Sequence, residues 1–348
     1  MKNQLRFHFS LILFVLVFGL GATNSKSVNV TPLTDEIQSL EWTVDNSWAQ
    51  AIAVSVSMTS ANDGWILGSR GFPGGYLAHW NGATWADWGT VPSSQAFVRG
   101  DIQMVSANDG WIVIGGPLSG GWPNLAQSII YRWDGSTWTQ FATVTDPNAV
   151  SLTAIDMISD TDGWATAWFN FGSHFYHWNG STWQKVSSIW LPLAPSNDID
   201  MVSAIDGWAV GWGIARWDGN AWTSVTSPVT TTLNSIAMVS ATNGWAVGEG
   251  GVILNWDGNT WFQMTSPVTT TLNSIAMVSA TNGWAVGEGG VILHWDGNTW
   301  TTVTSPVNSN LDAVDMVSAT DGWAVGDEIL HYGLVGPISK IYLPLVLK

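Results

Sequence analysis

The chain has 348 residues, of which 46% are hydrophobic and only 10% are charged, and its formal net charge is −16. This acidity argues against binding to nucleic acid or to an anionic membrane surface, because phosphate groups attract Lys and Arg. The absence of cysteine excludes disulfides, thiol catalysis and the usual zinc-finger and iron–sulfur sites.

Residues 1–22 have the layout of a secretory signal peptide. Lys2 and Arg6 precede an apolar stretch at 9–20, and the small residues Gly21 and Ala22 follow it. A stretch of about 12 residues is too short to cross a hydrocarbon core of ~30 Å. We therefore expect an exported protein, secreted or held at the cell surface, that is not inserted in the membrane once the signal peptide is cleaved. The alternative is an uncleaved anchor. Residues 23–37 are expected to form a linker.

A Gly-Trp dipeptide preceded by Asp or Asn recurs along the rest of the chain at intervals of 37 to 53 residues. Two of the units, 227–261 and 266–300, are identical except for Asn255 in the first and His294 in the second. Repeats of about 40 residues are typical of β-propellers. The seven tryptophans of this dipeptide are Trp65, Trp111, Trp164, Trp208, Trp245, Trp284 and Trp323.

The unit around Trp284 predicts four short strands, at 274–279, 284–287, 291–295 and 299–303. A turn is expected at Asn282-Gly283, another at the glycines of 288–290 and a third at 296–298, because Asn, Asp and Gly accept the backbone of tight hairpins. Four strands per unit match one propeller blade. We predict an all-β, seven-bladed β-propeller of four-stranded antiparallel blades over residues 38–335.

Each complete unit also has two tryptophans five residues apart, such as Trp295 and Trp300, and a methionine in its first strand. We interpret both sets as core between blades rather than as a ligand platform. The seventh unit lacks an outer strand, and residues 42–48 resemble one. Pairing of this N-terminal strand with the last blade would close the ring and cover an exposed edge.

The segments 283–293 and 296–300 resemble the repeat of the photosystem II assembly-factor-like propellers, part of the sialidase-like group with Asp-box (BNR) repeats. The resemblance covers about residues 40–333. It departs from the Asp-box pattern, because the Ser is absent and the spacing from Asp to Trp is one residue shorter. The resemblance implies the seven-bladed fold and does not transfer a photosynthetic role. Residues 336–348 form an apolar C-terminal tail, either a sorting or surface-retention signal or a segment packed on the side of the propeller.

Unit lengths vary in the loop between the second and third strands and in the blade-to-blade connection, which lie on one face of a propeller. Such loops are where binding usually occurs. The long loops carry aromatic residues that suit sugar stacking or a protein hot spot, or that cover the core. Replacing Trp122 by Ala is then expected to weaken binding without lowering the melting temperature. The candidate ligand-binding residues are Phe72, Tyr76, Trp122, Phe169, Phe171 and Trp190.

A second candidate site is the central channel, where Asp156, Asp200 and Asp315 precede the repeated methionine. A partial ring of carboxylates suits a hard cation such as calcium, and solvated channel lining is the alternative. The Asp-Gly carboxylates, such as Asp296, are interpreted as turn formers. We expect no metal site built from the histidines at the shared repeat position, because this position supplies at most one per blade.

Catalysis has little support, because Arg132 and Arg216 occupy the same repeat position as the histidines and no known catalytic motif is present. We expect a non-enzymatic recognition or scaffold propeller, monomeric and without a cofactor, that binds a protein or peptide through its loop face. The alternatives are lectin-like glycan binding by the loop aromatics and a degenerate sialidase-like glycan hydrolase.

Overall fold

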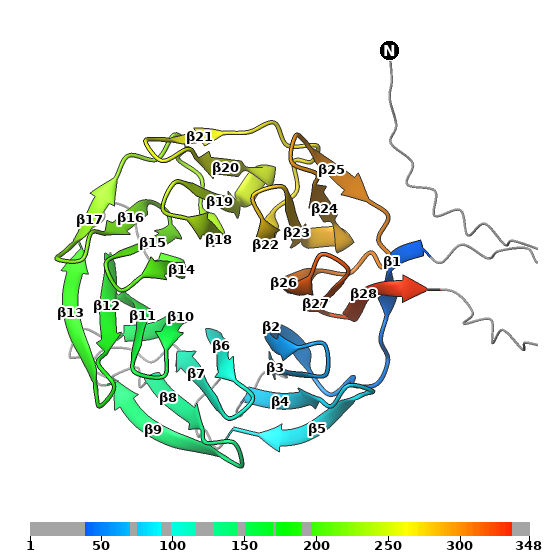
Figure 1. Cartoon of the computed structure of the whole chain (residues 1–348), viewed down its shortest axis with the longest axis horizontal. Coiled ribbons are helices and arrows are strands. Elements are labelled where there is room, and N and C mark those ends of the chain that lie inside the picture. The colour runs from blue at the N-terminus through cyan, green and yellow to red at the C-terminus, as the bar shows by residue number, and fades with distance from the viewer. Residues whose placement is uncertain are drawn as a thin grey trace, which may run out of the picture. The chain divides into compact units, whose positions relative to one another are not determined.

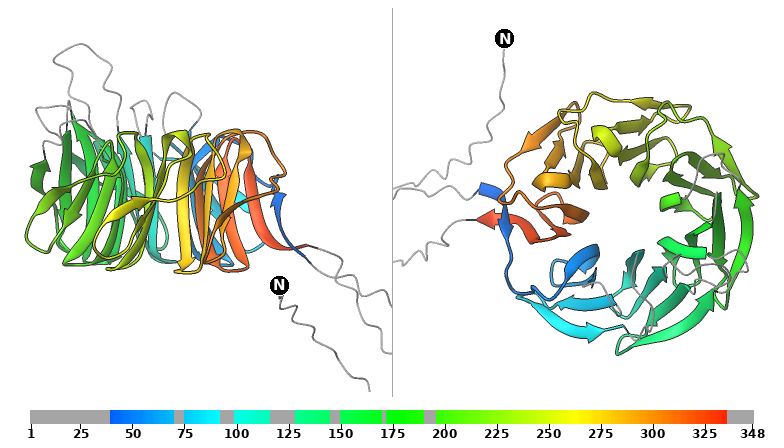
Figure 2. Two further views of the ribbon diagram at one scale, coloured as in Figure 1. Left: turned by 90° about the horizontal axis from the view of Figure 1, so that it is seen from above. Right: turned by 180° about the vertical axis from the view of Figure 1, so that it is seen from behind.

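The computed structural model describes residues 39–69, 75–91, 99–115, 128–144, 150–169, 172–189 and 196–335. These residues form seven four-stranded antiparallel sheets arranged as a ring around a central channel, which is the predicted seven-bladed β-propeller (Figure 1). In each sheet the strands follow one another from the channel outward, and they run between the two faces of the ring (Figure 2). No helix within these described ranges is long and apolar enough to span a membrane.

The first three blades have the longer strands. Blade 1 contains β2 (Ile52–Ser60), β3 (Asp63–Ser69), β4 (Gly75–Trp80) and β5 (Trp85–Thr90). Blade 2 contains β6 (Arg99–Ser106), β7 (Asp109–Gly115), β8 (Ser128–Trp133) and β9 (Trp138–Val144). Blade 3 contains β10 (Val150–Ser159), β11 (Asp162–Phe169), β12 (Gly172–Trp178) and β13 (Trp183–Ile189).

Blades 4 to 6 have shorter outer strands, and blade 7 is completed by the N-terminal strand. Blade 4 contains β14 (Ser196–Ser203), β15 (Asp206–Gly211), β16 (Ile214–Trp217) and β17 (Trp222–Val225). Blade 5 contains β18 (Leu233–Ser240), β19 (Asn243–Gly248), the 3-10 turn η1 (Glu249–Gly251), β20 (Ile253–Trp256) and β21 (Trp261–Gln263). Blade 6 contains β22 (Leu272–Ser279), β23 (Asn282–Gly287), η2 (Glu288–Gly290), β24 (Ile292–Trp295) and β25 (Trp300–Val303). Blade 7 contains β26 (Leu311–Ser318), β27 (Asp321–Gly326), β28 (Ile329–Val335) and β1 (Ser39–Val44).

The predicted position of the first hairpin turn was wrong by two residues. In blade 6 the turn lies at residues 280–281, and Asn282 and Gly283 already belong to β23, where Asn282 pairs with Ser279. The glycine is needed for packing rather than for the turn, because a Cβ at Gly283 would lie 2.1 Å from Sδ of Met277. The same overlap, between 2.1 and 2.3 Å, recurs in all seven blades. The repeated methionine therefore explains why a glycine precedes the repeated tryptophan.

The third predicted turn is confirmed. The Asp296 carboxylate accepts hydrogen bonds from the backbone N–H groups of Asn298 and Thr299, both at 2.8 Å, and Gly297 has a φ of +93°. This left-handed backbone favours glycine, and the Asp side chain takes up the two donors that the turn leaves free. The Asp-Gly carboxylates therefore form turns, as expected.

The tryptophans fill the spaces between neighbouring blades. The ring of Trp245 in blade 5 lies 4.7 Å from Trp295 and 5.4 Å from Trp300 in blade 6, between ring centroids, and all three side chains are buried. Tilted and edge-on contacts of this kind are the favoured arrangements of aromatic pairs. The same three-ring contact recurs at the other seams and confirms their interpretation as core.

The closure of the ring by the N-terminal strand is also confirmed, although the strand is Ser39–Val44 rather than 42–48. It pairs antiparallel with β28, with Trp42 opposite Tyr332. Both rings pack against Trp284 of blade 6, with centroids at 5.4 Å and 4.6 Å. Trp42 and Tyr332 thus take the places that two tryptophans occupy in the other blades.

Candidate functional site

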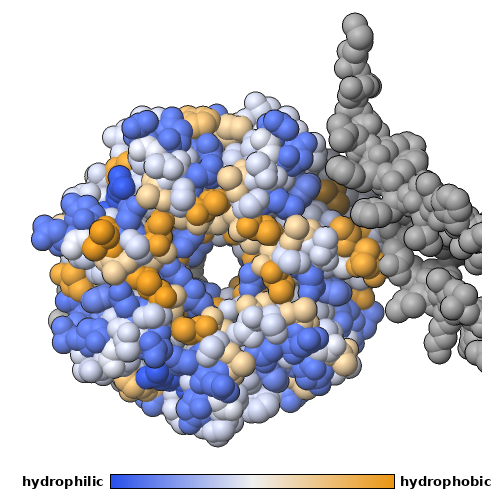
Figure 3. Space-filling view, in the orientation of Figure 1, coloured by the Kyte–Doolittle hydropathy of each residue, from blue (hydrophilic) through white to orange (hydrophobic). Residues whose placement is uncertain are grey.

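The seven innermost strands line a central channel with a cavity volume of about 520 Å³. In the space-filling view the channel is open along its axis (Figure 3). Because side chains alternate along a strand, each inner strand presents every second residue to the channel. Two rings of side chains result, which we call the turn-side ring and the loop-side ring.

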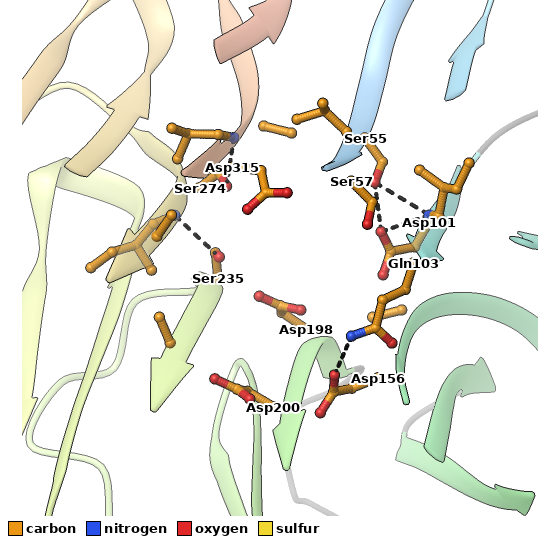
Figure 4. Close-up of a pocket in the computed structure, with 18 of the residues that line it drawn as sticks. Ser55, Ser57, Asp101, Gln103, Asp156, Asp198, Asp200, Ser235, Ser274 and Asp315 are labelled. Atoms are coloured by element: carbon orange, nitrogen blue, oxygen red, sulfur yellow. Dashed lines mark hydrogen bonds between the residues drawn. The ribbon is translucent and has the colours of Figure 1, made fainter. Parts of the chain in front are cut away.

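The turn-side ring consists of the residues that directly precede the repeated methionine, and the loop-side ring lies two residues earlier. The turn-side ring is Ser57, Gln103, Asp156, Asp200, Ala237, Ala276 and Asp315. The loop-side ring is Ser55, Asp101, Ala154, Asp198, Ser235, Ser274 and Ala313. The structure thus places the three predicted carboxylates in the channel and adds Asp101 and Asp198 (Figure 4). Side chains on one face of a strand are two residues apart, so counting back two residues from Gln103 and Asp200 would have identified these two carboxylates from the sequence.

Most of these polar side chains join one blade to the next. Asp156 accepts a hydrogen bond from the backbone N–H of Met201 at 2.6 Å, and Asp315 accepts one from Met58 at 2.7 Å. The loop-side ring repeats the pattern, since Asp198 accepts from Ile236 N at 2.9 Å. An inner strand has no sheet neighbour on the channel side, so these carboxylates satisfy N–H groups that the ladder leaves free. Their first role is to hold neighbouring inner strands together.

The channel carboxylates lie close together without a basic partner. Among the described residues that line the channel there is no Lys, Arg or His. Burial, together with the charge of Asp101, raises the pKa of Asp156 to about 6 and that of Asp198 to about 7. Burial and then the charge of Asp156 raise the pKa of Asp200 as well. Part of this acidic set is therefore protonated near neutral pH.

A metal site needs several ligands close together as well as negative charge. Within the described ranges, no three His, Cys, Asp or Glu side chains come close enough together to hold a metal ion. One carboxylate oxygen of Asp200 accepts a hydrogen bond from the backbone N–H of Met238 at 2.5 Å, as in the neighbouring carboxylates. Calcium binding in the channel stays a prediction.

No family model and no curated protein matches the sequence. Solved structures do match. The chain is similar to YCF48 bound to D1 peptide, with 19% identity and a TM-score of 0.63 over 86% of this chain and 96% of that one. It is similar to YCF48 from Cyanidioschyzon merolae at 14% identity and a TM-score of 0.63, covering 84% and 98%. The WD40 propeller domain of Doa1 matches at 13% identity and a TM-score of 0.65, covering 87% and 99%.

At these identities the likeness shows the fold alone. The fold is a seven-bladed β-propeller. YCF48 is a photosystem II assembly factor, so the expected resemblance to the photosystem II assembly-factor-like propellers holds at the level of architecture, and the matches do not show an Asp-box repeat. A shared fold does not show what this propeller binds.

The variable loops meet on one face of the ring, which we call the loop face. Glu249 N donates to Thr232 O at 2.9 Å, which joins a second-to-third-strand loop to a blade-to-blade connection. Asp327 N and Asn310 O make the same contact in blade 7, at 3.0 Å. The two kinds of variable loop therefore lie together around one mouth of the channel, as the repeat lengths predicted.

Of the six predicted aromatic residues, Tyr76 alone has both its backbone and its side chain among the described parts of the chain. Phe72, Trp122, Phe171 and Trp190 lie outside the described residues, and for Phe169 only the backbone at the end of β11 is described. These five stay predictions.

Tyr76 lies in a strand and not in a loop, which corrects the expected placement. It pairs with Gly68 of β3 and Thr90 of β5, and it packs partly buried against the core cluster that includes Trp48. β4 begins earlier relative to its tryptophan than the corresponding strands of blades 5 and 6 do, so the antiparallel pairing continues through Tyr76.

The sequence analysis missed an exposed aromatic residue, Trp212. It lies in the short loop between β15 and β16 on the loop face, and 50% of its surface is exposed. The signal was the Trp212-Gly213 loop, at the place where blades 5 and 6 have Glu-Gly-Gly-Val between the same two strands. A large, rigid and half-exposed ring is the kind of side chain that anchors interfaces.

The repeat position shared by histidine and arginine lies near the opposite face. His79 contacts Asp63 at 2.7 Å and Arg132 contacts Asp109 at 3.0 Å, where each Asp precedes the Gly-Trp dipeptide. The Arg132 guanidinium also lies 4.9 Å from the centre of the Trp111 ring. The His79 and Arg132 side chains thus each pair with an Asp and cover the repeated tryptophan of their own blade.

Proposed function

We propose that this chain is an exported, non-enzymatic recognition propeller that binds a protein or peptide partner through its loop face. The observation that carries the proposal is the gathering of the variable loops around one channel mouth, with Trp212 half exposed among them. Loops that vary in length on a rigid repeat scaffold are the usual place for binding. The signal-peptide pattern of residues 1–22 supports export.

The polar side chains of the ring favour recognition over catalysis. The carboxylates of Asp156, Asp198 and Asp315 are hydrogen-bonded to the backbone of the next blade, and Arg132 is paired and stacked. These groups have structural partners within the ring. A propeller of the same architecture is known bound to a peptide, namely YCF48 with D1 peptide.

A photo-crosslinking experiment tests the proposed face. A benzophenone amino acid replaces either Trp212 on the loop face or Asn220, an exposed residue in the β16–β17 turn on the opposite face. We expect light-dependent crosslinks to a protein of the source's cell envelope from position 212 and none from position 220. Equal crosslinking from both positions, or none from position 212, would contradict the proposal.

Glycan binding is the second candidate, and the exposed Trp212 favours it because a flat ring suits stacking on a sugar. A glycan array with the mature chain from Thr23, run with and without calcium, tests this candidate. Binding that is lost in Trp212→Ala, with an unchanged melting temperature, would support a lectin. Turnover of a chromogenic glycoside would instead support a degenerate sialidase-like hydrolase.

A further inference from the structure

The loop face has a second hollow besides the channel mouth, at the seam where the ring closes. It has a volume of about 720 Å³ and lies between blade 7 and blade 1. Its walls are the β1–β2 connection at 45–51, the start of β2 and the β27–β28 loop. Val54 lines both this hollow and the channel, so the two lie next to each other. We call this hollow the seam cleft.

The seam cleft exists because the closing seam is built differently from the two seams that precede it along the chain. Between blades 5 and 6, η1 lies against the blade connection, where a Cβ on Gly251 would meet Val268 O at 2.2 Å, and Val268 packs against the core. The seam between blades 6 and 7 is filled in the same way by η2 and Val307. In both seams a four-residue loop and a valine of the blade connection fill the space between the blades.

In blade 7 the corresponding loop is two residues shorter. Gly326 N donates to Glu328 O at 2.9 Å, whereas in blade 5 the equivalent bond reaches from Gly248 N to Val252 O at 3.0 Å. The connection from β1 carries Asp-Asn-Ser-Trp instead of the Ser-Pro-Val of the repeats. The closing seam therefore has neither the longer loop nor the valine that fills the seams between blades 5 and 6 and between blades 6 and 7.

The chemistry of the cleft combines an apolar floor with an acidic rim. Trp48 and Ile329 are buried in the floor, and Ile52 is 49% exposed beside them. Asp327 and Glu328 are exposed on the rim. No Lys, Arg or His is among the described residues that line the cleft. A basic side chain next to an apolar one would complement both features.

The negative field of the rim reaches the channel mouth. Burial and then the charge of Asp327 raise the pKa of Asp312, at the channel end of blade 7, to about 6. A cation placed at the rim would reduce this repulsion. A cleft of this volume is also within the ~300–1,000 Å³ range of sites that enclose a small molecule or a few side chains.

We propose that the seam cleft binds a short segment of the partner protein that carries a Lys or Arg next to an aliphatic or aromatic residue. The basic group pairs with Asp327 and Glu328, and the apolar side chain lies on Ile52 and Trp48. This proposal rests on the proposed function, because it assigns a partner chemistry and a position on the loop face to that function.

The test uses an array of immobilised hexapeptides that place one Lys or Arg and one Leu, Ile or Phe at every spacing. A matched set has Glu in place of each basic residue. We expect the mature chain to bind members of the basic set only. The best of these peptides, labelled with fluorescein, then gives a Kd by fluorescence anisotropy.

Two variants remove the two halves of the cleft separately. Glu328→Lys reverses a charge on the rim and is expected to raise the Kd at least tenfold, and Ile52→Ser removes the exposed floor and is expected to raise it severalfold. Glu288→Lys is the matched control, because Glu288 is exposed in the equivalent loop of blade 6. It should change the Kd by less than twofold, and all three variants should melt as the wild type does.

Binding of the acidic set, absence of binding to either set, or an equal effect of Glu288→Lys and Glu328→Lys would overturn the assignment of the cleft. Binding that develops only after removal of residues 336–348 would overturn it in favour of the chain's own C-terminal segment as the occupant. Crosslinking from position 212 is a separate readout. A positive result there, combined with any of these outcomes, would keep the loop-face function and discard the seam cleft.

Discussion

Removal of the N-terminal strand is the most direct test of how this ring is held together. Trp42 is 4% exposed and packs between Trp284 of blade 6 and Tyr332 of its own blade. Burying such a ring removes about 150–250 Å² from water, which corresponds to about 4–6 kcal/mol at about 25 cal/mol/Å². Large-to-small substitutions of aromatic core residues cost about 3–5 kcal/mol, so Trp42→Ala should lose about 4 kcal/mol.

The expected change in melting temperature follows from the size of the propeller. Unfolding entropy is about 2.1 cal/mol/K per residue, or about 0.6 kcal/mol/K for roughly 300 residues, so a loss of about 4 kcal/mol lowers Tm by about 6–7 °C. The matched control is Trp300→Ala in blade 6, where the buried ring has equivalent contacts. The two point variants should lose similar stability.

Deletion of residues 38–48 should cost more than Trp42→Ala. It also removes the β1–β28 ladder and exposes the edge of β28. We expect scanning calorimetry and far-ultraviolet circular dichroism to show loss of the single cooperative transition. A deletion variant that melts at the wild-type temperature would refute the role of β1 in closing the ring.

Two further predictions concern the channel and the loop face. Burial raises the pKa of Asp198 to about 7 from an ordinary value of 3.8, so its contribution to stability is complete below about pH 4 and is lost as the pH rises through 7. Asp198→Asn keeps an acceptor for Ile236 N and removes the buried charge, so it should raise Tm at pH 8 and leave Tm unchanged at pH 4. An equal change in Tm at the two pH values would contradict this. Gly248→Ala places a Cβ 2.1 Å from Thr232 O and should cost more than about 3 kcal/mol in urea unfolding, whereas Gly250→Ala, with no atom within 4 Å but a φ of +68°, should cost about 1 kcal/mol.

The repeat made the architecture predictable from the sequence. Blades 1 to 6 are each built from contacts within about 40 residues, so the strands, the Asp296 turn and the paired tryptophans are local features that hydrophobic alternation and turn residues encode. The closing strand was also predictable, because the seventh unit lacks a piece that the chain supplies before the first. The Asn282-Gly283 turn was misplaced because a glycine required by Met277 looks the same in sequence as a glycine required by a turn.

The tertiary structure decided which polar groups are free and which are engaged. That Asp156 binds Met201 N, and Asp198 binds Ile236 N, depends on the rotation between neighbouring blades, which no spacing within one repeat reveals. The seam cleft depends on how two ends of the chain meet, and its lining comes from residues more than 250 positions apart. The sequence alone determined the seven blades and the repeated part of their core, since those contacts recur in every unit. The seam cleft arises at the single seam where the repeat is broken, and only the closed ring shows it.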